Sequence, residues 1–554
     1  MLNIKNLISK YKCKYLVVII LMIITSLINT LLPYIIKQAI SLAENVTSFN
    51  EISSKILFIV AIYITLSIIC AFLEYIKNIS LTKNTEGLTS EIREEAYKKV
   101  ISFNMDTFSN MHISTLITRM TADINNIGDF IGRILPMFIS AGIFLIVVLV
   151  VMCFINIYFA LVMIICSLIL VFILLKLGKK MEYYNRKSIE NTEKLNNYFG
   201  ETFSGINTIN LFNIQKERKE ELDKYNKEET DIAKNYFTIQ SALHPVESMT
   251  KYSIIAIIIY LCIQGKVAGI DIGIIYVVVS YIDKFFEPLA HILYHYENLQ
   301  QGKVSIKRID DLLQKKENIE NIYKGESTEK LEGNISFKSV NFSYTEGKQV
   351  LNNVTFAINK GEKVALVGET GAGKTTIINL ILGFYKVNSG NILFDGKNMD
   401  DISLESIRKN VSFIQQNPYI FDDTIKRNIT INENNAISDE KIIDILKEVQ
   451  LYDKVKTFED GIYEKVKDNI FSKGEKQLLA FARAIAKETS IYIFDEPTSN
   501  IDVESEIQLK KVIDNLSKDS TVIIIAHRPT TIENVDKVLR VEDGKVVQMK
   551  SNKI

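Results

Sequence analysis

Residues 368–376 read Gly-Glu-Thr-Gly-Ala-Gly-Lys-Thr-Thr, which has the spacing Gly-x-x-x-x-Gly-Lys-Thr of a phosphate-binding loop. Glycines let backbone N–H groups curl around phosphates without a Cβ atom in the way, and Lys374 can reach the β- and γ-phosphates. The Thr375 hydroxyl can ligate Mg²⁺. Residues 362–367 read as a buried strand that enters the loop, and 376–382 as a helix whose N-terminus faces the anion. The stretch therefore predicts an α/β nucleotide-binding domain.

We expect the nucleotide phosphates to contact the whole loop. Its candidate cofactor-binding residues are Gly368, Glu369, Thr370, Gly371, Ala372, Gly373, Lys374, Thr375 and Thr376.

The bulk composition indicates a chain of several domains in which apolar residues are concentrated. The 554 residues carry 65 Lys+Arg and 65 Asp+Glu, so net charge gives no indication of nucleic acid. Mean hydropathy is +0.11 and 47% of residues are hydrophobic, which is high for a soluble protein. The five cysteines all lie in or beside apolar runs and form no C-x-x-C pair. We therefore interpret them as small apolar residues of membrane helices rather than as disulfide or metal partners.

Long uncharged stretches predict a membrane domain. Residues 15–36, 56–73 and 134–175 contain no charged side chain. A bilayer core needs about 20 helical residues, so the third stretch is long enough for two spans, with a turn at Asn156. Two weaker segments follow, at 252–265 and 272–293. The predicted spans are about 15–36, 56–76, 134–155, 157–177, 252–265 and 272–293.

The lysines before the first span set the expected orientation. Lys5, Lys10, Lys12 and Lys14 favour a cytoplasmic N-terminus in a multi-pass protein of a bacterial cell membrane. Six spans then return the C-terminal half to the cytoplasm. A secretory signal is the weaker alternative, because the apolar run is too long and no A-x-A-like cleavage site follows it. The domain prediction is a membrane domain at 1–302, a linker at 303–333 and a nucleotide-binding domain at 334–554.

Three further positions have the chemistry of an ATP site. Tyr344 precedes Gly368 by 24 residues and could stack on adenine, although a Tyr at a strand end is usually a packing residue. The apolar run 491–494 ends in Asp495, which can hold Mg²⁺ through water, and in Glu496, which can deprotonate the attacking water. His527 follows another apolar strand. On its own it would be structural, but its place in this ordered series favours a functional role.

At this point the chain resembles the ATP-binding cassette (ABC) exporters, in which six membrane helices are fused to one nucleotide-binding domain. Residues 368–376 match the Walker A loop, Tyr344 the adenine-stacking A-loop, Gln416 the Q-loop, Asp495 and Glu496 the Walker B end, 499–502 the D-loop and His527 the switch histidine. Phe471-Ser472-Lys473-Gly474-Glu475 resembles the signature written L-S-G-G-Q. Segments 114–123 and 200–213 resemble the two coupling segments.

The resemblance implies an ATPase that drives export by alternating access, with an all-α membrane domain and an α/β P-loop domain. Glu496 is then the general base, His527 positions the γ-phosphate, and Thr375, Gln416 and Asp495 serve Mg²⁺ and water. In this family Ser472 and the Gly474 amide would touch ATP held by a second chain. The implied cofactors are ATP and Mg²⁺, and the implied partner is a second half-transporter.

The signature departs from the family pattern. Phe471 replaces Leu, Lys473 replaces Gly and Glu475 replaces Gln, and the approach 466–471 is about two residues shorter than V-G-E-x-G-x-x-L. The chain's own Glu496 and His527 match the family, whereas the surface that it offers to a partner does not match fully. We therefore favour a heterodimer over a homodimer.

Polar side chains interrupt the last predicted span, at Asp283, Lys284, Glu287, His291 and His295. Charges at membrane depth usually face a cavity or a partner. We favour an intrahelical ion pair between Lys284 and Glu287, with contact to substrate and metal binding by the two histidines as alternatives.

Two other classes of function are less favoured. An ATP-gated channel or regulator conflicts with the intact Glu496 and His527, and an importer component conflicts with the fused membrane domain. The cargo stays open between a small molecule, a peptide and a lipid, and the chain is also expected to contact membrane lipid but no nucleic acid.

Overall fold

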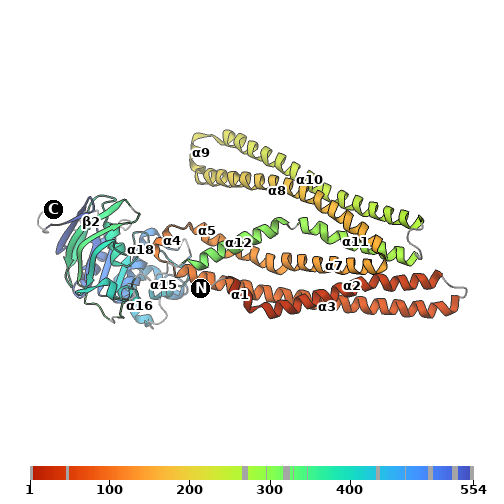
Figure 1. The fold of residues 1–554 in the computed structure, drawn as a ribbon. Helices are drawn as coiled ribbons and strands as arrows, with labels where there is room; N and C mark the ends of the chain where they lie inside the picture. The colour runs from red at the N-terminus through yellow and green to blue at the C-terminus, as the bar shows by residue number, and fades with distance from the viewer. Residues whose placement is uncertain are drawn as a thin grey trace. The chain divides into compact units, whose positions relative to one another are not determined.

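The computed structural model describes residues 4–44, 49–264, 272–294, 296–315, 323, 325–327, 330–345, 347–431, 437–467, 470–496, 503–526 and 534–549 (Figure 1). Two compact units divide the chain. The helical unit comprises Met1–Val100 and Ile113–Lys315, and the sheet unit comprises Ile101–His112 and Lys316–Ile554. The fold is thus a helical N-terminal unit followed by an α/β unit.

Long helices make up the helical unit. They are α1 (Ile4–Lys10), α2 (Lys12–Glu44), α3 (Phe49–Ile101), α5 (Ile113–Thr118), α6 (Ile124–Asp129), α7 (Leu135–Ile155), α8 (Ile157–Ser204), α9 (Ile206–Phe212), α10 (Gln215–Ile263), α11 (Ile272–Tyr294) and α12 (Tyr296–Gln314). Two π-helical turns, Arg119–Asp123 and Phe130–Ile134, lie between α5 and α7. Because α12 continues to Gln314, the first part of the predicted linker 303–333 is helical.

The predicted turn at Asn156 is confirmed. Asn156 is extended, with φ −165° and ψ 126°, and its side chain accepts a hydrogen bond from the Tyr158 N–H at 2.9 Å. A polar side chain that accepts from an early N–H of a helix is a typical N-cap. Asn156 therefore ends α7 and begins α8 within one residue.

Four stretches among the described residues are long and apolar enough to cross a membrane: Lys12–Leu42, Ser54–Ile101, Ile113–Ile155 and Ile157–Ser204. They contain the four stronger predicted spans. The weaker segments 252–265 and 272–293 fall on α10 and α11, which are not in this set. Within the apolar stretch of α3, large side chains such as Leu57, 73% exposed, and Phe58, 66% exposed, are not covered by the rest of the unit. Such a surface suits lipid or another apolar partner.

Helices α8 and α10 run side by side and form a long hairpin with α9 at its tip (Figure 1). Toward the opposite end, α7, α8, α10 and α11 share a core that includes Met152, Phe159, Ile258 and Phe286. Helix α11 is also tied to α2, because the Lys284 ammonium donates to the Asn29 carbonyl at 3.1 Å. The helical unit is therefore packed tightly at one end and opens along the hairpin.

Part of the predicted polar stripe can be located. Asp283 lies 3.9 Å from Lys251 of α10, and Lys251 also pairs with Glu247 at 3.0 Å. Asp283 thus faces a cation on a neighbouring helix. The side chains of Glu287, His291 and His295 lie outside the described ones, so the predicted Lys284–Glu287 pair stays a prediction.

The sheet unit contains two sheets. Its described strands are β1 (Ile335–Ser343), β2 (Gln349–Ile358), β3 (Lys363–Val367), β4 (Ser389–Phe394), β5 (Lys397–Asn398), β6 (Val411–Ile414), β7 (Ile491–Asp495), β8 (Thr521–Ile525), β9 (Lys537–Glu542) and β10 (Lys545–Met549). One sheet is antiparallel with the order β2-β1-β4-β5, and the other has the order β10-β9-β3-β8-β7-β6. In the second sheet β6, β7, β8, β3 and β9 are parallel.

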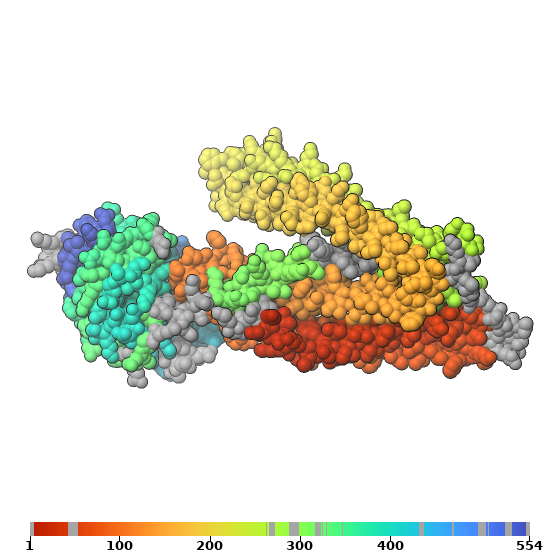
Figure 2. Space-filling view, in the orientation of Figure 1, coloured from red at the N-terminus to blue at the C-terminus, as the bar shows by residue number. Residues whose placement is uncertain are grey.

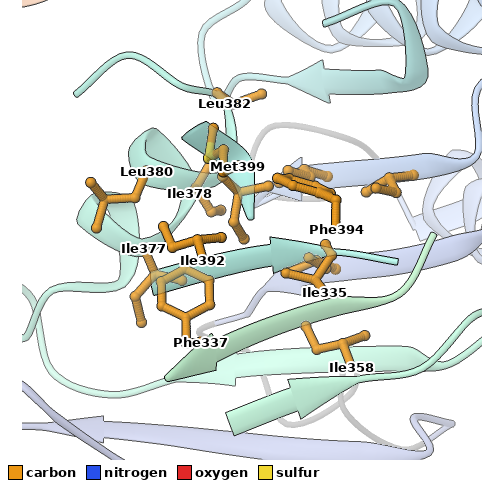
Figure 3. Packing of buried hydrophobic residues seen from close by; sticks show 14 of the residues in the cluster. Ile335, Phe337, Ile358, Ile377, Ile378, Leu380, Leu382, Ile392, Phe394 and Met399 are labelled. Carbon is orange, nitrogen blue, oxygen red and sulfur yellow. The ribbon is translucent and has the colours of Figure 1, made fainter. Parts of the chain in front are cut away.

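Helices cover these sheets. They are α13 (Lys374–Ile381), α14 (Leu404–Asn410), α15 (Ile425–Thr430), α16 (Asp439–Glu448), α17 (Tyr452–Val455), α18 (Lys473–Lys487) and α19 (Val503–Leu516). The sheet unit also contains α4 (Met105–Ser109), which comes from the inserted segment, Ile101–His112. Figure 3 shows Ile377 and Ile378 of α13 in one core with Phe337 and Phe394 of the antiparallel sheet. This core fixes the start of α13 relative to β3. The loop between these two elements is the one predicted to hold phosphate.

Candidate active site

The loop 368–373 joins the inner strand β3 to α13, as predicted. Gly368 has φ +152°, and a Cβ atom there would lie 2.3 Å from the Val541 carbonyl oxygen. Gly373 has φ +113° and precedes the first residue of α13. Both positions require glycine, because an L side chain would be strained or would collide with the backbone. The sequence thus gives the loop the tight path that exposes its N–H groups.

Lys374 is folded back over its own loop. Its ammonium donates to the carbonyls of Gly368 at 2.6 Å and Glu369 at 2.9 Å, and the residue is 6% exposed. Burial lowers the pKa of Lys374, while the charges of Glu496 and Asp495 act to raise it. The lysine therefore lies within electrostatic range of both predicted carboxylates, which come from the end of β7.

Glu496 occupies a strained backbone position directly after β7. Its φ is +48°, a left-handed conformation that costs a non-glycine residue energy and that is found preferentially at functional sites. The Gln416 side-chain amide donates to the Glu496 carboxylate, and Gln416 follows β6, the neighbour of β7. The parallel strands β3, β6 and β7 thus bring Lys374, Gln416 and Glu496 to one edge of the sheet.

A residue that the sequence interpretation missed, Gln477, contacts the backbone of Glu496. The buried Gln477 of α18 donates its side-chain amide to the Glu496 carbonyl at 3.3 Å. This contact ties the helix that begins at the signature to the residue predicted to be the general base. No local pattern distinguishes Gln477 from any other buried helical side chain.

Tyr344 presents a partly exposed ring beside α13. Its hydroxyl lies 3.1 Å from the Thr376 hydroxyl, and its ring packs edge-on against Phe342 at 4.9 Å and Tyr385 at 5.0 Å between centroids. The residue remains 40% exposed. A fixed ring with an open face is suited to stacking on a planar base.

Tyr385, another missed residue, connects this ring to the inserted segment 101–112. Burial raises the pKa of Tyr385, a hydrogen bond with Ser109 opposes that shift, and Tyr344 and Asp106 add to it. The segment that packs within the sheet unit is therefore Ile101–His112, whereas the predicted coupling segment 114–123 belongs to the helical unit. The role of 114–123 as a coupling segment stays a prediction.

The signature begins α18 with an intact capping box. The Ser472 hydroxyl accepts from the Glu475 N–H at 3.2 Å, and the Glu475 carboxylate accepts from the Ser472 N–H at 2.7 Å. The shortened approach closes where the Ile470 N–H donates to the Lys467 carbonyl at 3.1 Å. Substitution of Gln by Glu therefore leaves the N-terminus of α18 well formed.

Other predicted site residues are only partly located. Thr375 is exposed at the start of α13, and Asp495 is half-buried at the end of β7. His527 and the D-loop 499–502 lie outside the described residues. The loop, Gln416, Asp495 and Glu496 are thus brought together, whereas Ser472 and Gly474 lie at the start of α18.

The helical unit contains a cavity of about 880 Å³ between the α8–α10 hairpin and α6 and α12 (Figure 2). Its lining mixes apolar side chains such as Met181 and Leu243 with the charged Glu182, Arg186 and Arg308. Ser305, which also lines the cavity, donates a hydrogen bond to the buried Asp123 at 2.7 Å. A hollow with this mixed lining is suited to an amphipathic molecule.

Comparisons with known proteins match both units. Residues 15–289 match the ABC transporter transmembrane region, and residues 351–499 match the ABC transporter family. The chain is 29% identical to the multidrug resistance-like ATP-binding protein MdlB of Buchnera aphidicola (subsp. Schizaphis graminum), over 92% of this chain and 88% of the relative. It is 30% identical to a Rickettsia typhi protein provisionally named as an export ATP-binding/permease protein, over 97% of this chain and 93% of the relative. It is 27% identical to the fatty acid ABC transporter ATP-binding/permease protein of Mycobacterium bovis, over 90% and 79%.

Proposed function

The chain belongs to the ABC transporter family, and on that premise we propose a role for each residue of its ATP site. One polypeptide carries a transmembrane region and an ATPase domain that drives export across a membrane. Lys374 neutralises phosphate charge, Glu496 is the general base toward water, and Gln416 orients both Glu496 and that water. His527 positions the γ-phosphate. The observation that carries this proposal is the Gln416–Glu496 hydrogen bond at the strand edge that Lys374 shares.

Mg²⁺ is the proposed metal of the site. The hydroxyl of Thr375, the amide oxygen of Gln416 and the carboxylate of Asp495 are oxygen donors of the kind that Mg²⁺ prefers. These residues would hold the ion, which would supply positive charge beside the phosphates during phosphoryl transfer. The raising effect of Asp495 on the Lys374 pKa supports this assignment, since both groups then lie near the phosphates.

ATP binding by two chains follows from the signature. Ser472 and the Gly474 amide of one chain are proposed to contact the γ-phosphate of ATP that the other chain holds in its loop 368–376, while Tyr344 stacks on the adenine. The position of Ser472 and Gly474 at the N-terminus of α18 supports this role, because the start of a helix favours an anion. Each chain therefore needs a partner before its own ATP is enclosed.

The partner is proposed to be a different half-transporter. The loop, Gln416 and Glu496 of this chain are complete, whereas Phe471, Lys473 and Glu475 depart from the signature pattern. A chain of this kind would hydrolyse ATP in its own site and offer its altered signature to the site of the partner. Strong ATPase activity of this chain purified alone as a homodimer would overturn the heterodimer.

The membrane arrangement is proposed to comprise six spans with both termini in the cytoplasm of a bacterium. The four apolar stretches supply the first four spans, and α10 and α11 supply the last two. The cargo is proposed to be an amphipathic small molecule, peptide or lipid that enters the cavity between the α8–α10 hairpin and α12. The mixed lining of that cavity supports an amphipathic cargo.

The experiment that tests the proposed ATP site is the Glu496→Gln variant, assayed together with whichever partner copurifies. We expect ATP binding to persist and hydrolysis at this site to fall by about 100-fold or more, because general base catalysis contributes that much. Unchanged turnover would remove Glu496 from the role of base. Loss of ATP binding as well would indicate a folding defect, which a thermal unfolding measurement separates.

A further inference from the structure

The altered signature places a carboxylate where a phosphate is proposed to bind. Glu475 stands at the third position of α18, and its carboxylate accepts from the backbone N–H of Ser472, the residue proposed to contact the partner's γ-phosphate. Two anions close together repel each other, most strongly where water is excluded. An uncompensated Glu475 would therefore weaken the closure of this signature over ATP.

A lysine from another helix meets this carboxylate. Lys454 of α17 lies with its Nζ atom 2.6 Å from Oε2 of Glu475, which is the same oxygen that accepts from Ser472. Both side chains are mostly covered, with 34% of Lys454 and 27% of Glu475 exposed. The ion pair is thus sheltered and is screened less than a fully exposed pair.

The same lysine also contacts Phe471. Its Nζ atom lies 5.3 Å from the centre of the Phe471 ring, within range of a cation–π interaction. Phe471 is 4% exposed and packs edge-on against Phe458 at 5.9 Å, so the ring is fixed in the core. Two of the departures from the family signature, Phe471 and Glu475, therefore share Lys454 as their partner.

Glu475 keeps its charge at neutral pH. Partial burial acts to raise the pKa of its carboxyl, but the hydrogen bonds from Lys454 and Ser472 outweigh burial and leave the pKa below its ordinary value. A proton therefore does not remove the negative charge, and a cation must offset it.

We propose that Lys454 is a positioning residue of the signature, which cancels the charge of Glu475 so that Ser472 and the N-terminus of α18 accept the γ-phosphate of a partner's ATP. The inference rests on the proposed two-chain ATP site. It restores by an ion pair the neutrality that the family pattern obtains from a glutamine. It also predicts that the altered signature remains competent to bind ATP.

The test compares single and double charge-neutralising variants in the full-length transporter with its copurifying partner. The Kd for ATP at the partner's site, over which this signature is proposed to close, is measured for Lys454→Gln, Glu475→Gln and the double variant. We expect about a tenfold rise for Lys454→Gln, the order of one poorly screened charge repulsion, and a return to near the wild-type value in the double variant. Lys454→Arg should retain the wild-type value. Lys456→Gln is the matched control, because Lys456 flanks α17 and pairs with Asp453 instead, at 2.6 Å.

Each outcome bears on the inference. If the double variant is as impaired as Lys454→Gln, the lysine is structural and the inference fails. It also fails if Lys454→Gln changes nothing, or if replacement of the exposed Lys473 by Gln has the larger effect. Ser472→Ala separates this failure from failure of the proposed function: if that variant is unimpaired, the signature does not close over ATP at all, and both proposals fall together.

Discussion

The side-chain amide of Gln416 donates a hydrogen bond to the carboxylate of Glu496, across 80 residues of sequence. The contact forms because β6 and β7 are adjacent parallel strands, so that the residues after each strand meet at one edge. Glu496 is held in a left-handed conformation with φ +48°. Its carboxylate direction therefore depends on partners from other elements.

Replacing Gln416 by Ala should lower turnover more than ATP affinity. The carboxylate of Glu496 loses the donor that orients it, while the phosphate loop is untouched. We expect kcat to fall about 10- to 100-fold with a change in KM of less than about threefold, since misplacement of a catalytic group acts mainly on the chemical step. Steady-state ATPase assays measure both constants. Gln415→Ala is the control, because Gln415 is exposed beside Gln416 on the same strand end; an equal loss in both variants would indicate a general disturbance of β6.

Replacing Tyr344 by Ala should weaken ATP binding at this site. Stacking of a base on an aromatic ring contributes about 1–3 kcal/mol, so the Kd for ATP should rise roughly 5- to 150-fold. Tyr344→Phe retains the ring and loses the hydroxyl contacts with Thr376 and Asn379, so its affinity should stay close to that of the wild type. Fluorescent ATP-analogue titration measures both variants. Equal affinity in Tyr344→Ala and the wild type would leave the ring as a packing residue.

Replacing Phe394 by Ala should destabilise the sheet unit. Phe394 is 0% exposed and lies with Ile335 in the core between α13 and the antiparallel sheet (Figure 3). Removal of a buried Phe side chain costs about 3–5 kcal/mol, because burial is lost and a cavity remains. Hydrogen exchange in the full chain should therefore show lower protection of the β3 amides, which measures the loss of stability of the sheet unit. The exposed Phe421→Ala is the control and should leave it unchanged.

The sequence predicts those parts of the site that depend on local pattern. The loop glycines and Lys374 follow from spacing, and the carboxylates of Asp495 and Glu496 follow from their place after an apolar strand. Contacts made by unrelated segments could not be predicted. Lys454 meets Glu475 and Tyr385 meets Ser109 only because tertiary packing brings their elements together. No periodicity or motif records such a meeting.

The unit to which segment 101–112 belongs could not be predicted, for the same reason. The sequence of segment 114–123 resembles a coupling segment of the family. The residues that pack in the sheet unit are Ile101–His112. Asn104 caps α4, because its side chain accepts a hydrogen bond from the N–H of Thr107 at 2.8 Å. Which unit that short helix joins is decided by packing, and composition does not reveal it.

Acidification should weaken the sheet unit partly through Glu362. Burial acts to raise the pKa of its carboxyl, but hydrogen bonds from Lys537 at 2.7 Å and from Asn359 outweigh burial and leave the pKa below its ordinary value. A carboxyl with a lowered folded-state pKa adds stability above the pKa of the unfolded chain, and this stability is lost as the pH falls through the folded-state pKa. Glu362→Gln should therefore lose stability at neutral pH and show a shallower decline on the acid side. Chemical denaturation at a series of pH values measures this, and parallel curves for the two proteins would exclude the contribution.

Replacing Phe212 by Ala should uncouple ATP use from movement of the membrane helices. At the tip of the α8–α10 hairpin, Leu211 is 78% and Phe212 is 68% exposed, and Asn213 turns the chain with φ +53°. Large apolar side chains at an exposed tip indicate a surface that a partner covers. The segment resembles the second coupling segment, so we expect the cassette of the second chain to be that partner.

The expected result for Phe212→Ala is normal ATP binding with a loss of the ATP-driven change in the membrane unit. Pulsed electron–electron double resonance measures the distance between spin labels placed between α2 and α3 in the two chains. This distance reports the change without knowledge of the cargo. Phe203→Ala is the matched control, because Phe203 is 69% exposed on the same hairpin but stacks on Phe199 at 5.9 Å. If Phe203→Ala abolished the change and Phe212→Ala did not, the surface of α8 around Phe203 would transmit the movement. The tip of the hairpin would then not be the docking surface.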